Sequence, residues 1–148
     1  MTTQEFSRSF PMMLIRALDA VMPRFREIFK EFGLTEQQWR VLRVLWEQDE
    51  ISFRDLADIT LIAGPSLVGV VDRLKTQGLV DRRRSNTDRR NVFIFSTDKG
   101  KDLHLQVRPK VDQVYAELQA SMAPAEWREI INNLDRVVSL PLESKVAD

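Results

Sequence analysis

The stretch from Leu79 to Thr97 limits the possible folds of this 148-residue chain more than any other segment. It opens with an apolar pair, continues through arginines at 82–84 and turn formers at 85–88, and ends in a β-prone run at 92–95. Two strand-forming runs separated by turn residues predict a β-hairpin. Because an isolated hairpin is only marginally stable in water, we expect this one to pack against helices.

Two short helices are predicted directly before the hairpin. Ser52, followed by Asp55, has the pattern of a helix start. Gly64 and Pro65 mark the start of a second helix, ending near Gln77, because proline suits a first helical turn. The residues expected to face the core are Leu56, Ala57, Ile59, Leu67, Val70, Val71 and Leu74. Two short helices followed by a basic hairpin predict a winged helix-turn-helix, in a mainly α fold class with a small β-hairpin wing.

Longer helices are predicted on both sides of this unit. Apolar residues at steps of three and four predict an amphipathic helix over 6–32, which Pro23 should kink or break. Thr35 and Gln38 have the spacing of a capping box and begin the next helix. The apolar stripes of 6–32 and 98–140 are larger than one winged unit can cover. We therefore expect these helices to intertwine with those of a second copy in a homodimer.

The length of the chain is typical of a single domain, which we expect to cover 1–148. Within it, 35–97 would be the winged helix-turn-helix lobe that binds DNA, and 6–32 and 98–140 would be dimerisation helices. Thr97 has the side chain of a helix N-cap and should begin the helix that follows the lobe.

Charge is clustered locally in this chain. The sequence has 22 Lys or Arg and 22 Asp or Glu, so its formal net charge is zero. Between Leu79 and Lys101, however, seven Lys or Arg stand against three Asp. Because the whole chain has no basic excess, any attraction to nucleic acid must come from local clustering of this kind. Five arginines within nine residues predict the phosphate backbone of double-stranded DNA as the partner.

Composition excludes several classes of function. The chain has no cysteine, which rules out disulfides, thiolate catalysis and cysteine-ligated zinc. His104 is the only histidine and cannot build a metal site alone, and neither a nucleophile elbow nor a phosphate-cradling glycine loop occurs. We therefore expect no enzyme activity, no metal and no cofactor. No signal peptide or membrane span is predicted, so the expected location is the cytoplasm.

Single basic residues can also be interpreted as ordinary solvated charges. The arginines at 82–84 alternate between the two faces of a strand, so all three are not expected to contact phosphate. Arg54 and Lys99, each near the start of a helix, are phosphate contacts or plain surface charges. Arg73 contacts phosphate or pairs within the protein.

Five short motifs follow one another along the chain: LTEQQW at 34–39, DRL at 72–74, GLV at 78–80, DRR at 88–90 and STDKG at 96–100. In this order and spacing, and over nearly its whole length, the chain resembles the MarR (multiple antibiotic resistance regulator) family of bacterial transcription factors. It is also similar to the subgroup that controls homoprotocatechuate and related aromatic catabolism, through the stretches TEQQWRVLRVL and GPSLVGVVDRL.

The resemblance implies a homodimer that binds a palindromic operator and usually represses transcription. It also implies release by small phenolic or aromatic carboxylate ligands, which bind between the dimerisation helices and the DNA-binding lobe. In the family, a wing arginine enters the minor groove and an aspartate two residues earlier holds the wing. Arg90 and Asp88 match these two positions.

The recognition helix departs from the family pattern. Many members offer serine, threonine and arginine to the major groove, whereas here only Ser66 among the matching positions has a hydrogen-bonding side chain. Val68 can meet a thymine methyl group, and shape readout by Arg90 should carry more of the specificity. The residues predicted to bind DNA are Arg54, Pro65, Ser66, Val68, Gly69, Arg73, Arg82, Arg84, Asp88, Arg89, Arg90 and Lys99.

Trp39 lies one residue off the core stripe of its helix and has two interpretations. It packs against the first helix, or it forms a wall of an aromatic ligand pocket. In the second case Arg16, Arg40 or Arg43 would meet a ligand carboxylate, because guanidinium and carboxylate geometries match. Arg43 and Glu47 are four residues apart and are also placed to form a surface ion pair.

These features predict a homodimeric winged helix-turn-helix regulator, a repressor released by an aromatic acid. Two alternatives stay open. A winged helix used as a protein-interaction module would show no salt-sensitive affinity for DNA. A DNA-binding regulator that responds to no ligand would lack a pocket between its first, second and fifth helices.

Overall fold

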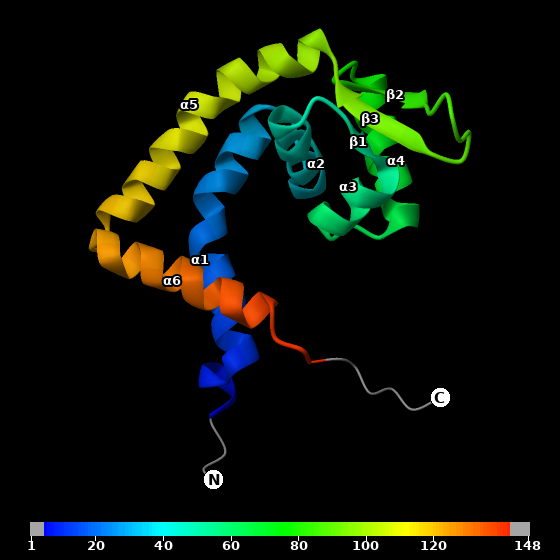
Figure 1. Cartoon of the computed structure of the whole chain (residues 1–148). Coiled ribbons are helices and arrows are strands. Elements are labelled where there is room, and N and C mark those ends of the chain that lie inside the picture. The colour runs from blue at the N-terminus through cyan, green and yellow to red at the C-terminus, as the bar shows by residue number, and fades with distance from the viewer. Residues whose placement is uncertain (1–4, 143–148) are drawn as a thin grey trace. The chain divides into compact units, whose positions relative to one another are not determined.

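The computed structural model describes residues 5–142 (Figure 1). Its elements in chain order are the 3-10 turn η1 (Phe6–Arg8), α1 (Phe10–Glu31), α2 (Glu36–Glu47), β1 (Ile51–Ser52), α3 (Phe53–Thr60), α4 (Gly64–Thr76), β2 (Val80–Arg84), β3 (Val92–Ser96), α5 (Asp98–Ala120) and α6 (Pro124–Val138). The predicted fold class, mainly α with a small β wing, is confirmed. The chain forms two compact units, which divide within α5 between Val111 and Asp112.

The wing is the outer part of a three-stranded antiparallel sheet with the order β1-β3-β2. β2 pairs with β3 along its whole length, ending with Arg84 opposite Val92, so the predicted hairpin is confirmed. β1 adds only two residues, which pair with Phe93 and Ile94 in the middle of β3, with Ile51 opposite Ile94. The hairpin therefore continues beyond its third strand, as the loop at the right of Figure 1 shows.

Local capping sets where several helices begin and end. Thr35 Oγ1 accepts a hydrogen bond from Gln38 N and Gln38 Oε1 accepts one from Thr35 N, both at 3.1 Å, which confirms the capping box. At the start of α3, Ser52 Oγ accepts a hydrogen bond from Asp55 N at 3.1 Å. Gly78 follows α4 with φ of 76°, the left-handed conformation that terminates helices.

The first helix differs from its predicted extent of 6–32. Ser9 lies at the N-cap of α1, but its hydroxyl donates to Phe6 O at 2.9 Å and closes the short turn η1 instead of capping α1. α1 then continues through Pro23. Of the two outcomes expected at this proline, a break in the helix is therefore excluded.

The end of α3 also departs from the sequence pattern. Ile59, predicted to face inward, is 55% exposed. The buried face of α3 instead follows Leu56 and Thr60, and Ile59 lies about 100° from Thr60 around the helix axis. Leu61 then adopts φ of 57°, which is strained for a residue other than glycine, and the next residue, Ile62, is buried.

The core of the winged lobe lies between α2, α3, α4 and the sheet. All four residues predicted to face inward from α4 are buried. The largest side chains with less than 2% exposure in this lobe are Val41, Leu42, Leu56, Leu67, Val70, Val71, Leu74, Val80 and Ile94. Removal of this apolar surface from water is the main force that holds the wing and α4 together.

The first turns of α5 are fixed to the winged lobe. Thr97 caps α5, because its Oγ1 accepts a hydrogen bond from Gly100 N at 3.2 Å, and the same hydroxyl donates to Gly78 O at 2.6 Å. The Trp46 indole N–H donates to Gly100 O at 3.0 Å. The His104 ring stacks on Trp46 with 4.5 Å between ring centroids. These contacts join α5 to α2 and to the loop after α4.

Gly100→Ala should destabilise the lobe by about 1–3 kcal/mol. A Cβ at this position would lie 2.3 Å from Leu79 O and 2.4 Å from Ser96 Oγ, so the backbone would have to shift. Gly69→Ala is the matched control, because a Cβ there meets nothing within 4 Å and should stabilise α4 by about 0.5–1 kcal/mol. Urea unfolding followed by circular dichroism measures both changes, and equal effects would contradict the close approach at Gly100.

Candidate nucleic-acid interface

The outward side of α4 carries the residues predicted to meet the major groove. Pro65 and Ser66 are exposed, and Val68 is 45% exposed. The N-cap residue of α4 is Ala63, whose side chain cannot cap the first N–H groups of the helix. At Gly69 an added Cβ would meet nothing within 4 Å, which leaves room for a partner to approach.

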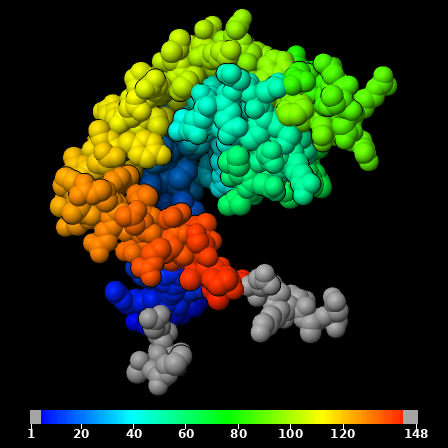
Figure 2. Space-filling view, viewed as in Figure 1, coloured from blue at the N-terminus to red at the C-terminus, as the bar shows by residue number. Residues whose placement is uncertain are grey.

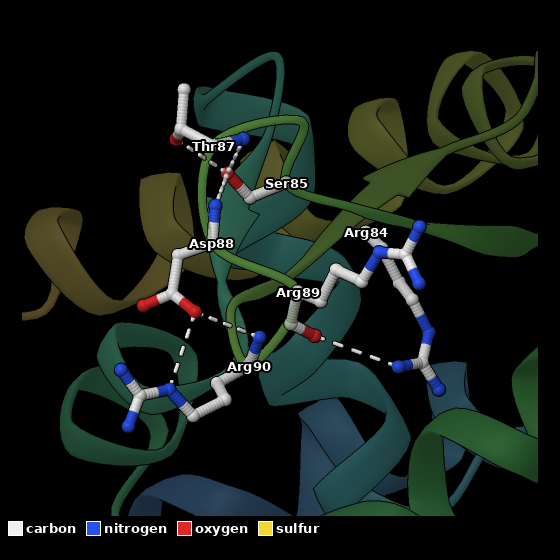
Figure 3. Close-up of polar contacts among 6 residues, drawn as sticks. All are labelled: Arg84, Ser85, Thr87, Asp88, Arg89 and Arg90. Atoms are coloured by element: carbon white, nitrogen blue, oxygen red, sulfur yellow. Dashed lines mark hydrogen bonds and ion pairs between the residues drawn. The ribbon is translucent and has the colours of Figure 1, made fainter.

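Ser85 organises the loop at the tip of the wing (Figure 3). Its Oγ accepts hydrogen bonds from Thr87 N at 3.2 Å and Asp88 N at 3.3 Å. Two backbone hydrogen bonds close the loop, from Ser85 N to Asn91 O (2.9 Å) and from Asn91 N to Asp88 O (3.0 Å). Short polar side chains thus supply the local hydrogen bonds that give this turn one shape.

Asp88 holds Arg90 at the wing tip. Asp88 Oδ1 accepts hydrogen bonds from Arg90 N (3.0 Å) and Arg90 Nε (3.3 Å), as Figure 3 shows. The Arg90 side chain is nevertheless 92% exposed, and within residues 5–142 its two terminal nitrogens form no hydrogen bond. Arg84 Nη1 donates to Arg89 O at 3.5 Å across the hairpin. The structure therefore brings together the predicted aspartate and arginine, with a fork of donors left open to solvent.

Arg82 and Arg83 of β2 lie on opposite faces of the sheet. Arg82 Nη2 lies 2.5 Å from Oδ1 of Asp72 in α4. Arg83 forms a two-point ion pair with Glu50, with Nε 2.8 Å from Oε2 and Nη2 bonded to Oε1. Hydrogen bonds from Arg83 lower the pKa of Glu50, and Glu50 in turn raises the pKa of Arg83. Both residues are therefore charged at neutral pH.

A surface cavity of about 290 Å³ lies between α4 and the wing. Apolar side chains that include Val68 line it, together with three arginines from three elements: Arg54 of α3, Arg82 of β2 and Arg90 of the wing loop. The structure thus gathers four predicted DNA-binding residues around one hollow. In Figure 2 the tip of the wing stands out from the rest of the winged lobe at the right of the view.

Three of the predicted cations have no side-chain partner in the part of the chain that the structure describes. Arg54, Arg73 and Arg89 form no side-chain hydrogen bond or ion pair with another residue of 5–142. Of the two interpretations of Arg73, pairing within the protein is therefore not observed. Lys99 differs, because its Nζ donates to Gln77 O at 2.7 Å at the end of α4.

Trp39, the predicted wall of a ligand pocket, belongs to an aromatic cluster. Its ring centroid lies 4.8 Å from that of Phe29 in α1 and 5.7 Å from that of Trp46. The edge-to-face arrangement with Trp46, at 77°, is favourable for aromatic pairs. Trp39 therefore packs against the first helix, and because it remains half-buried the second interpretation, the wall of a ligand pocket, stays open.

The three arginines predicted to meet a ligand carboxylate lie in different settings. Arg40 Nη1 donates to Thr60 O at 3.4 Å, at the end of α3. Arg43 and Glu47 form the expected ion pair at 2.8 Å. Arg16 is exposed on α1, and no hydrogen bond or ion pair joins it to another residue described here. These side chains are thus not tied to one another.

Glu50 and Ser85 were not among the residues that the sequence indicated. Glu50 lies 33 positions from Arg83, so no local pattern connects them. Ser85 offered a weak signal, since serine at the start of a turn commonly accepts backbone hydrogen bonds. Among residues 5–142, no group of three or more acidic or histidine residues could hold a metal ion. No helix in that range is both long enough and apolar enough to cross a membrane.

Residues 32–91 match the sequence model of the MarR family. The homoprotocatechuate degradative operon repressor of Escherichia coli is 33% identical to this chain over 132 residues, which cover 89% of each protein. The chain belongs to the MarR family. The resemblance to the homoprotocatechuate repressor subgroup, noted from two short stretches, is thereby confirmed.

Two solved structures of the MarR type are similar along almost their whole length. NadR in complex with 4-hydroxyphenylacetate is 33% identical, with a TM-score of 0.81 and coverage of 95% of this chain and 99% of that chain. BpsR of Bordetella bronchiseptica, whose DNA binding is regulated by 6-hydroxynicotinic acid, is 27% identical, with a TM-score of 0.84 and coverage of 94% and 99%. The relatives are regulators and not enzymes. This chain is a MarR-family transcriptional regulator.

Asp88→Ala should weaken DNA binding by this MarR-family protein roughly three- to tenfold, because Arg90 would lose the hydrogen bonds that hold it in place. Charge alone predicts the opposite, since the substitution removes a negative group beside DNA. Asp58→Ala, on the exposed side of α3, is the control for lost negative charge. Fluorescence anisotropy with labelled duplex measures both affinities. Tighter binding by Asp88→Ala would show that Asp88 acts only through its charge.

Proposed function

We propose that this chain is a homodimeric repressor that binds a palindromic operator and is released by a small aromatic carboxylate. The observation that carries the proposal is the group formed by Arg54, Arg82 and Arg90 beside Val68. Here a winged helix-turn-helix presents three cations and an apolar contact on one surface. Membership of a family of transcriptional regulators supports double-stranded DNA as the partner of that surface.

In this proposal α4 enters the major groove and the wing enters the minor groove. Ser66 offers a hydrogen bond to a base, and Val68 offers an apolar contact to a thymine methyl. α4 therefore offers few side chains for direct contacts with bases. Arg90, held by Asp88, recognises a narrow and electronegative minor groove by its shape. Contacts with phosphate are assigned to Arg54, Arg73, Arg82, Arg84, Arg89 and Lys99.

Exposed apolar faces on α1 and α6 support the homodimer. In the single chain, Leu18 of α1 is 55% exposed and Ile131 of α6 is 48% exposed. Large apolar residues repeat along the same helices, and contiguous apolar patches of this kind mark interaction surfaces. We assign 6–32 and 98–140 to the interface between copies, so that 35–97 of each copy reaches one half-site.

Named ligands of the relatives support an aromatic carboxylate as the effector. NadR was solved with 4-hydroxyphenylacetate, and 6-hydroxynicotinic acid regulates the DNA binding of BpsR. Both compounds combine an aromatic ring with a carboxylate. We assign the ring to Trp39 and the carboxylate to Arg16, Arg40 or Arg43. Ligand and DNA then favour different arrangements of the dimer, so each lowers the affinity for the other.

The protein should bind the intergenic DNA beside its own gene, with an affinity that falls steeply as salt rises, because bound cations release counterions from phosphates. Arg90→Ala should bind roughly tenfold or more weakly. Lys30→Ala, which removes a cation from α1, should bind as the unsubstituted protein does. Anisotropy titrations at several salt concentrations measure these affinities. Failure to bind any specific sequence would favour a protein-interaction module instead.

The same titration tests the effector. At least one acid in a panel that begins with 4-hydroxyphenylacetate and 6-hydroxynicotinate should lower the affinity for DNA, while benzyl alcohol, which lacks the carboxylate, should not. A response to the alcohol would argue against recognition by arginine. If no acid changes the affinity, the protein is a DNA-binding regulator without this class of ligand.

Leu18→Glu should convert the dimer to a monomer at micromolar concentration, because it buries a charge in the proposed interface between copies. Ile59→Glu is the matched control, since Ile59 is also 55% exposed but lies on α3, outside the proposed interface. Sedimentation velocity distinguishes the two species. If both variants remain dimeric, the assignment of α1 to the interface is wrong.

A further inference from the structure

Arg83 lies on the opposite face of the wing from the cavity that gathers the predicted DNA contacts. Side chains alternate between faces along a strand. Arg82 lies opposite Ile94, and both line that cavity. Arg83 lies opposite Phe93, so it belongs to the other face. The most central arginine of the basic run is therefore directed away from its neighbours.

The Arg83 side chain spans the whole width of the sheet. It starts on β2 and passes over the Phe93 ring of β3, with the guanidinium carbon 4.7 Å from the ring centroid. It ends on Glu50, the residue directly before β1, through two parallel hydrogen bonds. The Arg83–Glu50 pair thus connects β2 with the residue before β1, across the central strand β3.

The Arg83–Glu50 pair lies where the three-stranded part of the sheet ends. β1 pairs with β3 only at Ile51–Ile94 and Ser52–Phe93. Beyond Phe93 the hairpin has no third strand, and Arg83 lies opposite Phe93 at that limit. On the other face, the adjacent Arg82 is bonded to Asp72 of α4. The hairpin is therefore held from both faces at two consecutive residues, just before its free part begins.

We propose that Arg83 and Glu50 are positioning residues that set the direction of the wing and thereby the place of Arg90 on DNA. The inference rests on the proposed DNA-binding function. The part of the hairpin beyond Phe93 is not supported by β1. A small change in its direction at Phe93 therefore displaces the tip, which carries Arg90, by a larger distance. Arg83 itself makes no contact with DNA in this arrangement.

The pair is suited to fixing a direction more than to stabilising the fold. The side chains of Arg83 and Glu50 are 44% and 38% exposed, and exposed ion pairs contribute little to stability. Two parallel hydrogen bonds, however, restrict the relative orientation of a guanidinium and a carboxylate. The Phe93 ring limits it further, because the guanidinium lies over one face of that ring.

The experiment compares Glu50→Gln and Arg83→Gln on duplexes that the unsubstituted protein selects from a random-sequence pool. Both variants should bind these duplexes roughly two- to fivefold more weakly, since each loses the same ion pair. Neither substituted residue contacts phosphate in this proposal, so the salt slope should fall by clearly less than one. Circular dichroism and thermal unfolding establish that both variants remain folded.

A matched control separates this pair from surface ion pairs in general. Glu36 pairs with Arg26, with side-chain exposures of 38% and 47%, but the pair joins α2 to α1 and lies outside the wing. Glu36→Gln should leave the affinity for the selected duplexes unchanged. An equal loss in this control would overturn the specific role of Glu50.

A double-mutant cycle with Arg90→Ala tests whether the pair acts through Arg90. In the Arg90→Ala background, Glu50→Gln should cause a smaller loss of affinity than in the unsubstituted protein, because the main group that it positions is already absent. Full additivity would refute the positioning role. If instead Arg83→Gln lowers the salt slope by about one while Glu50→Gln binds equally or more tightly, then Arg83 is a phosphate contact.

These outcomes also separate the inference from the proposed function. If the unsubstituted protein selects no sequence from the pool, both the DNA-binding function and the positioning role are wrong. If it selects a sequence but neither Glu50→Gln nor Arg83→Gln changes the affinity, DNA binding stands and only the positioning role fails.

Discussion

The antiparallel pairing of β3 with both of its neighbours is the constraint on which the interface depends. Side chains alternate along a paired strand, so the register assigns Arg82 and Arg84 to one face and Arg83 to the other. A shift by one residue would exchange the two faces and move every charge to the wrong side. Three identical residues in a row thus acquire different roles from the pleat of the sheet, and not from their own chemistry.

The charged surface is positioned by an uncharged core. Ile94 of β3 and Leu74 of α4 are almost fully buried in the same core, which holds the wing and the outward side of α4 as parts of one body. The ion pairs at the surface are exposed and contribute little to the free energy of folding. They instead orient the side chains that the core brings together, as Asp88 does for Arg90 at the tip of the wing.

The start of α5 offers a physical route between the proposed dimer interface and the proposed DNA contacts. Trp46, Thr97 and Gly100 join the first turns of this helix to α2 and to the loop after α4 through hydrogen bonds of 2.6–3.2 Å. A Cβ at Gly100 would collide with Leu79 and Ser96 of the winged lobe. The backbone of α5 therefore packs directly against the lobe, with no room for a side chain between them. A change in the packing of the first turns of α5 would therefore reach the winged lobe directly through these contacts.

Features that depend on near neighbours along the chain were predictable from the amino-acid sequence. The hairpin, the capping box at Thr35 and the end of α4 at Gly78 follow from hydrogen bonds and backbone conformations within a few residues. The periodicity of α4 likewise predicted which of its faces is buried. The burial of Thr60 in place of Ile59 on α3, and the pairing of particular arginines with acids, depend instead on the packing of separate elements. Asp72 and Arg82 are 10 residues apart and Glu50 and Arg83 are 33 apart, so their meeting depends on how separate elements pack, which no local pattern records.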